Sequence, residues 1–253
     1  MILRRITQHV KDQNWFAVFL DFVIVVVGIL IAFQITNWND GREDFRQETK
    51  ALVELRKELA DSMVTTEAQL RAYGQAADAG KRSLAFIDGP KVCGDKCWDV
   101  IVDFMHASQW QNVTVNTTSY QNMRAQGFPE NTAIVDAVET YRIQNLNNMS
   151  AFEALPVYRS LVRQLINIQA QEYYWANCWA LIGGIEEYRL DCPEGVSADE
   201  AKQLVSEIVN NPNIKLHLTE WTGSIVSIPD TMGQQNDAAQ KAIDLIDEEL
   251  ERR

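Results

Sequence analysis

The 253-residue sequence has few of the residues that build metal and nucleophile sites, with only three histidines and four cysteines. Zinc requires four ligands at short spacings, and a di-iron bundle requires two Glu-x-x-His motifs. The single pair Asp103 and His106 satisfies neither pattern, and we expect it to form only a surface hydrogen bond. The sequence also lacks a Gly-x-Ser-x-Gly elbow and a phosphate-binding glycine loop. We therefore predict no cofactor, no metal and no enzyme active site.

Basic residues are scarce as well, with 23 Lys and Arg against 35 Asp and Glu, which gives a net charge of −12. The whole excess lies after residue 41, where 20 basic residues face 32 acidic ones. Affinity for nucleic acid depends on basic side chains that displace counterions from phosphates. The charge balance therefore predicts that nucleic acid is not a partner.

One long apolar run stands near the N-terminus, from Phe16 to Ile35, bracketed by Trp15 and Trp38. About 20 apolar residues cross a bilayer as a helix. The two indoles would lie about 34 Å apart, the spacing of the two headgroup regions. A signal peptide has a shorter run and a small-x-small cleavage site, which is missing here. We predict an uncleaved transmembrane anchor over residues 15–38, in contact with the lipid bilayer.

The orientation of this anchor rests on the cysteines, because basic residues flank both sides almost equally. Four cysteines in the soluble part suit an oxidising compartment. We therefore expect residues 1–14 in the cytoplasm and a soluble domain at 39–253 in the periplasm. The flanking basic residues are Arg4, Arg5 and Lys11 on one side and Arg42, Arg46 and Lys50 on the other.

One face of the anchor combines a carboxylate with small residues. At 100° per residue, Asp21, Gly28 and Ala32 fall within about 20° of one line. Small residues four apart let membrane helices approach closely. One interpretation is that Asp21 is protonated or draws water in locally. The other is that this face contacts a membrane protein partner or a second copy of the anchor.

The soluble part has helical spacing, with apolar residues recurring at steps of three, four and seven from Phe45 to Ile87. Gly74 or Gly80 can interrupt this helix, and Gly89-Pro90 ends it. Clean alternation is missing, so we expect no sheet. The expected fold class is all-α, with an N-terminal transmembrane helix followed by an exported up-and-down helical bundle. Further helices are expected at 97–110, 118–126, 131–147, 150–190, 197–210 and 217–251.

Two of these helices carry clear boundary signals. Ser197 and Glu200 have capping-box spacing, which predicts a helix start. Pro229 should break or kink the last helix.

The four cysteines allow local or crossed pairs. If residues 165–190 form one unbroken helix, Cys178 and Cys192 lie about 21 Å apart, too far for a disulfide. A break at Gly183-Gly184 would permit the local pairs Cys93–Cys97 and Cys178–Cys192, which we favour slightly over crossed pairs. The Cys93-Gly-Asp-Lys-Cys97 spacing differs from that of thioredoxin-type redox motifs, so a structural disulfide is favoured over a catalytic thiol.

Two segments resemble a known family. The run DFVIVVVGILIAFQITNWNDGR at Asp21–Arg42 follows Gln13-Asn14-Trp15, and TTSYQNMRAQG spans Thr117–Gly127. Both resemble segments of an uncharacterised family of bacterial single-pass membrane proteins, whose anchor ends in Asn-Trp-Asn. The resemblance implies a helical exported domain anchored in the bacterial inner membrane, and it implies no catalytic residues.

Three functions remain open from the sequence. The first is an interaction or scaffold subunit that uses the Asp21 face. The second is a periplasmic ligand-binding module that signals laterally through a membrane partner. The aromatic residues Tyr173, Tyr174, Trp175 and Trp179 would line its cavity, although we favour a place for them in the core. The third is a thiol–disulfide protein.

Overall fold

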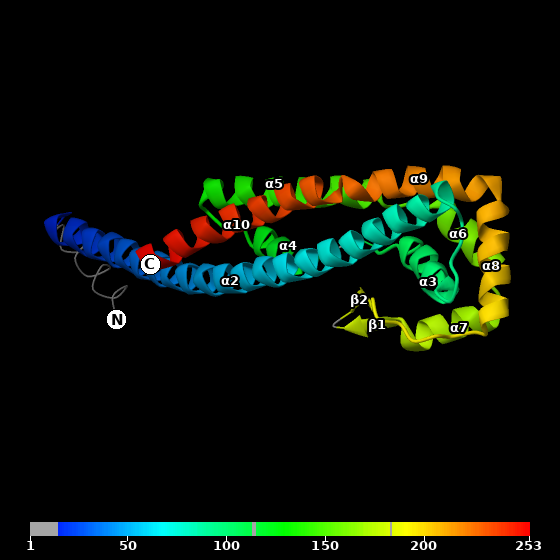
Figure 1. The fold of residues 1–253 in the computed structure, drawn as a ribbon. Coiled ribbons are helices and arrows are strands. Elements are labelled where there is room, and N and C mark those ends of the chain that lie inside the picture. The colour runs from blue at the N-terminus through cyan, green and yellow to red at the C-terminus, as the bar shows by residue number, and fades with distance from the viewer. Residues whose placement is uncertain (1–14, 113–114, 183) are drawn as a thin grey trace. The chain divides into compact units, whose positions relative to one another are not determined.

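The computed structural model describes residues 15–112, 115–182 and 184–253, and most of these are helical (Figure 1). The predicted all-α class is therefore confirmed. The chain divides into two compact units, residues 1–52 and 53–253. The helices are α2 (Trp15–Asp88), α3 (Cys97–Ala107), α4 (Thr118–Ala125), α5 (Thr132–Ala151), α6 (Val157–Leu165), α7 (Ile168–Asn177), α8 (Ala198–Asn210), α9 (Pro212–Val226) and α10 (Ile228–Arg252).

The first unit contains the apolar part of α2. This helix is long and apolar enough to cross a membrane, and no residue of its most apolar 18-residue stretch is buried by protein. The predicted segment 15–38 lies within this unit, whereas residues 1–14 lie outside the described residues. Neither Gly74 nor Gly80 interrupts α2, which ends at Asp88, directly before Gly89-Pro90.

In the second unit, α5 packs along α10. Asn148 near the end of α5 donates to Gln235 near the start of α10 (2.8 Å), and Asn131 at the start of α5 donates to Glu249 near the end of α10 (3.1 Å). These contacts make the two helices antiparallel, as Figure 1 shows.

A buried polar layer joins α2, α5 and α10. The Gln235 side chain accepts from Asn148 and donates to Thr66 of α2 (3.4 Å). All three residues are buried among apolar side chains. Arg56 of α2 also pairs with Asp247 of α10 (2.5 Å), so α2 runs antiparallel to α10 and therefore parallel to α5. The fold thus differs from a simple up-and-down bundle. The parallel helices α2 and α5 are connected by the chain segment that contains α3 and α4.

The larger apolar core lies where α3, α6, α7, α8 and α9 meet the end of α2. Small residues on α2, Ala72, Ala76, Ala79 and Gly80, let neighbouring elements approach closely. Trp221 of α9 fills the core and donates its indole N–H to the Ala107 carbonyl (2.9 Å). That bond satisfies one of the free carbonyls at the end of α3.

The predicted helix over 150–190 is wrong. Pro156 precedes α6, and the Asn167 side chain caps α7 by accepting from the Ala170 N–H (2.9 Å). The chain then forms an antiparallel hairpin of β1 (Trp179–Ile182) and β2 (Ile185–Tyr188), with Trp179 opposite Tyr188. The expectation of no sheet is therefore wrong too, because strands of four residues are too short to show alternation.

The two predicted boundary signals are confirmed. Ser197 is the N-cap of α8 and accepts from the Glu200 N–H (3.3 Å). A break separates α9 from α10, and Pro229 lies in the first turn of α10. Proline is tolerated there because the backbone N–H groups of a first helical turn have no acceptor within the helix, so the missing N–H of proline costs no hydrogen bond.

The contact of Gly80 with Thr222 gives a direct test of helix packing. A Cβ at position 80 would lie 2.4 Å from the Thr222 hydroxyl, whereas a Cβ at Gly74 would meet no atom within 4 Å. Both Gly→Ala changes gain helix propensity, but only Gly80→Ala overpacks the core. We expect Gly80→Ala to be less stable than Gly74→Ala by about 1–3 kcal/mol. Urea unfolding of both variants measures the difference, and equal stabilities would contradict the packing.

Candidate functional site

The anchor face is laid out by the helical geometry of α2. Asp21, Gly28 and Ala32 share one side of this helix because they follow its turns at steps of seven and four. A Cβ added at Gly28 would meet no atom within 4 Å, so this side is open to close approach. The Asp21 Oδ2 atom is itself buried and has no hydrogen-bond partner among the described residues. The face therefore holds an unsatisfied carboxylate oxygen on the same side of the helix as two small residues.

The tryptophans at the two ends of the apolar stretch are both exposed. Trp15 and Trp38 are separated by about 34 Å of helix. The Arg42 guanidinium lies 5.1 Å from the centre of the Trp38 ring. An indole and a cation together suit a membrane–water interface, where each finds polar surroundings on one side.

The four cysteines form the two local pairs. The Cα atoms are 4.8 Å apart in Cys93–Cys97 and 4.9 Å apart in Cys178–Cys192. The first pair closes the turn before α3. The second joins the end of α7 to the chain beyond β2, so it encloses the hairpin. The helix break that this pairing requires falls directly after Asn177, ahead of Gly183-Gly184.

His106 is buried at the base of the hairpin and is 1% exposed. Its Nε2 atom lies 3.3 Å from the Cys178 carbonyl oxygen, and its ring stacks 5.4 Å from the Tyr188 ring. Burial lowers the pKa of His106 to about 4; the bond to Cys178 opposes this effect, and the Arg82 cation adds to it. His106 is therefore a neutral structural residue at pH 7.

The expected surface hydrogen bond between Asp103 and His106 is wrong. The Asp103 carboxylate instead accepts a bidentate pair of bonds from Arg82 of α2 (2.6 and 3.0 Å). The two side chains separate because His106 turns into the core beneath the hairpin, whereas Asp103 faces α2.

The aromatic residues of α7 belong to the core, as favoured from the sequence. Tyr174 is fully buried, and Tyr173, Trp175 and Trp179 pack partly buried against the same cluster. Trp175 makes edge contacts with Tyr174 (5.2 Å) and with Trp179 (5.3 Å). These four aromatic rings form a wall that extends from the buried Tyr174 to the partly exposed Trp175 and Trp179.

Next to this wall, two arginines of α6 reach the C-terminal end of α3. Arg159 donates to the Ser108 carbonyl oxygen (3.0 Å), and Arg163 donates to the Gln109 side chain (3.0 Å). Cations at a helix C-terminus are stabilised by its dipole and its free carbonyls. The Gln109 amide also donates to the Tyr174 hydroxyl (2.9 Å). This polar cluster joins α3, α6 and α7.

The Thr117–Gly127 segment forms α4 and its two ends. The Glu58 carboxylate of α2 accepts from the Ser119 N–H (2.8 Å), so it caps the N-terminus of α4. Gly127 follows the helix with φ +90°, a conformation that suits glycine. The start of α4 is thus held by a distant residue of α2, and its end is set by the local conformation of Gly127.

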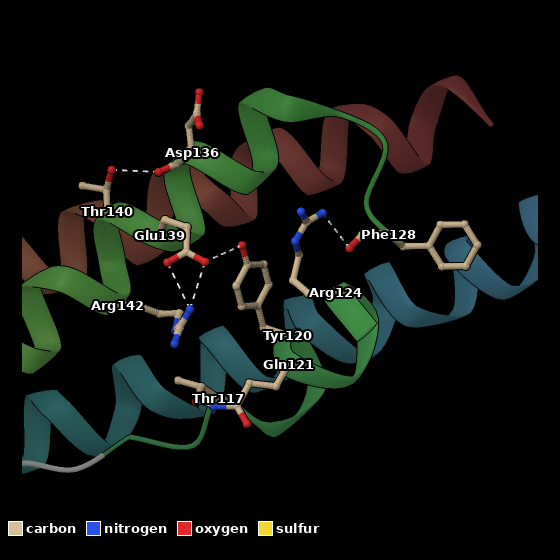
Figure 2. Close-up of polar contacts among 9 residues, drawn as sticks. All are labelled: Thr117, Tyr120, Gln121, Arg124, Phe128, Asp136, Glu139, Thr140 and Arg142. Atoms are coloured by element: carbon tan, nitrogen blue, oxygen red, sulfur yellow. Dashed lines mark hydrogen bonds and ion pairs between the residues drawn. The ribbon is translucent and has the colours of Figure 1, made fainter. Parts of the chain in front are cut away.

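Tyr120 of α4 connects this segment to α5, as Figure 2 shows. Its hydroxyl donates to Glu139 (2.9 Å), and Arg142 donates to both oxygens of the same carboxylate (2.9 and 3.0 Å). The Arg142 guanidinium also lies 5.6 Å from the centre of the Tyr120 ring. Burial and the bond to Glu139 raise the pKa of Tyr120 to about 12. Contacts inside the protein account for these groups, so this cluster is structural.

The sequence did not identify Arg159 and Arg163 as a site. One feature of the sequence could have indicated them. Arg159 and Arg163 are four residues apart, and each directly follows a buried residue of the same helix, Tyr158 or Val162. Basic residues at the edge of a buried helix face are candidates for buried polar contacts. The polar residues they meet, Ser108 and Gln109, come from a distant segment and carry no local pattern.

Comparisons with known proteins return no match. No protein-family model, no curated protein and no solved structure matches the chain. The described part therefore defines an all-α protein with one helix able to cross a membrane.

The depressed pKa of His106 predicts acid destabilisation. The unfolded chain binds a proton near pH 6.5, whereas the folded protein resists it until about pH 4. Stability should therefore fall as the pH drops through this window, by about 1.5 kcal/mol between pH 6.5 and 5. His106→Gln should flatten this part of the profile relative to the natural chain. Denaturant unfolding at several pH values tests this; equal slopes in the two proteins would refute it.

Proposed function

We propose that this protein is a single-pass subunit of the bacterial inner membrane, in which α2 anchors an acidic helical domain in the periplasm. Its role in this proposal is that of an interaction or scaffold subunit. The observation that carries the proposal is the apolar stretch of α2, which no protein surface covers. Large exposed apolar surface on a single helix is stable in a bilayer and unfavourable in water.

The lateral contact is assigned to the face of Asp21, Gly28 and Ala32. Lipid tails give no hydrophobic drive for helix association, so close packing and polar contacts supply it. Gly28 and Ala32 permit close packing. The Asp21 Oδ2 atom, which has no hydrogen-bond partner among the described residues, gains most from a hydrogen-bond donor on a neighbouring helix. The partner in this proposal is a membrane helix of another protein or of a second copy.

The periplasmic placement is supported by the two disulfides. Disulfides persist in oxidising compartments and are rare in the cytosol. Cys178–Cys192 encloses the hairpin, so its loss would free a whole structural element. A domain built around two such bonds suits the periplasm.

The contact face is tested by co-purification of the full chain in mild detergent. Gly28→Leu should block the close approach, and Asp21→Leu should remove the acceptor. We expect each change to reduce recovery of the associated membrane protein, or of a tagged second copy, by at least about tenfold, equivalent to 1.4 kcal/mol.

The matched control is Val26→Leu, which adds bulk on the opposite side of α2. It should leave association intact. If all three variants retain the same partners and the same oligomer size as the natural chain, this face has no role in assembly.

Topology is tested by labelling thiols in intact spheroplasts with a membrane-impermeant maleimide. We expect no labelling until an impermeant phosphine reductant is added. Cys93 and Cys192, the more exposed member of each pair, should then react first. A variant with all four cysteines changed to serine provides the background. Labelling that needs permeabilised membranes would place the domain in the cytosol instead.

A further inference from the structure

Helix α6 carries two cations one turn apart. Arg159 and Arg163 are both half-buried, and each has its guanidinium against the end of α3. Burial lowers the pKa of both groups, that of Arg163 to about 10, and the Arg159 cation contributes to the effect on Arg163. Two like charges held this close in partly dry surroundings favour an anion beside them.

The acceptors that hold the two guanidinium groups are neutral. They are the Ser108 carbonyl and hydroxyl oxygens and the Gln109 amide oxygen. Among the described residues, no carboxylate forms an ion pair with either arginine. Glu186 influences both only at longer range. Two arginines and one glutamate leave the cluster with one uncompensated positive charge, although the whole protein is acidic.

The arginines are also held in place before any ligand arrives. Ser108 and Gln109 are fully buried, and Gln109 is fixed in turn by the buried Tyr174 hydroxyl. Rigid donors lose little entropy on binding, which favours recognition over a flexible surface pair.

Both guanidinium groups keep donors for a further acceptor. Within the described chain, Arg159 makes no hydrogen bond from Nε or Nη2, and Arg163 makes none from Nη1. None of these three nitrogen atoms is fully buried, so solvent reaches them. A planar guanidinium matches a carboxylate with parallel hydrogen bonds.

An apolar wall adjoins the cations. The Arg163 guanidinium lies 5.0 Å from the centre of the Trp175 ring, and Trp175 meets Trp179 edge-on at 5.3 Å. Both indoles are partly exposed. The surroundings therefore combine one excess positive charge with aromatic surface, which suits an organic acid better than an inorganic ion.

We propose that Arg159 and Arg163 form a binding site for one small organic carboxylate, whose apolar part lies against Trp175. The carboxylate accepts from the unused guanidinium N–H groups and neutralises the excess charge. The site is independent of the proposed membrane contact, because every residue in it belongs to the unit 53–253.

The test is calorimetric titration of the full chain in neutral detergent with sodium benzoate, sodium acetate and sodium phosphate, at an ionic strength held constant with chloride. We expect saturable binding of one benzoate per chain, with acetate weaker because it lacks a ring to contact Trp175. Arg159→Gln and Arg163→Gln should each weaken benzoate binding at least tenfold. Arg163→Lys, which keeps the charge and loses the planar fork, should weaken it as well.

The control is Arg142→Gln, a partly buried arginine that already has its carboxylate partner in Glu139. It should leave benzoate binding unchanged. Near-UV circular dichroism checks that each variant is folded. If both glutamine variants unfold, the natural chain and Arg163→Lys decide the question. Heat that fails to saturate with benzoate in the natural chain, or phosphate binding tighter than benzoate, would overturn the proposal.

Discussion

Helix α2 has to satisfy two environments with one backbone, and the rest of the structure depends on how it does so. Its first part is apolar apart from Asp21 and Gln34 and is not covered by protein, which is stable only where water is excluded. Its later part presents alanines, Gly80 and the polar side chain of Thr66. These small and polar groups let α9 and α10 pack closely and in one register. A single element therefore carries both the membrane signal and the packing surface.

The C-terminal end of α3 is the second organising point. Its free carbonyls and the two residues that follow receive an indole N–H from Trp221 and guanidinium groups from Arg159 and Arg163. Helix ends buried without partners are unfavourable, so these donors stabilise the core. Both arginines keep guanidinium N–H groups that make no hydrogen bond to the described chain. These unused donors distinguish a candidate binding site from arginines that only cap the end of α3.

Local signals predicted most of the helices and their limits. Ser197 starts α8 and the chain breaks beside Pro229, because capping and proline chemistry act within a few residues. The same reasoning failed over residues 150–190. There the asparagine cap at Asn167 interrupts an apolar pattern that still has helical spacing, and the Cys178–Cys192 bond joins the base of a hairpin too short to show its period.

The sequence alone determined the all-α class, the apolar helix able to span a membrane and the shared face of Asp21, Gly28 and Ala32, because each follows from the local period of one helix. Only the tertiary structure decided that α2 runs parallel to α5, that His106 is buried beneath the hairpin, and that Arg159 and Arg163 meet Gln109. Those outcomes depend on contacts between segments distant in the chain. The free energy of such contacts comes from burial and polar pairing across the core, which no local pattern records.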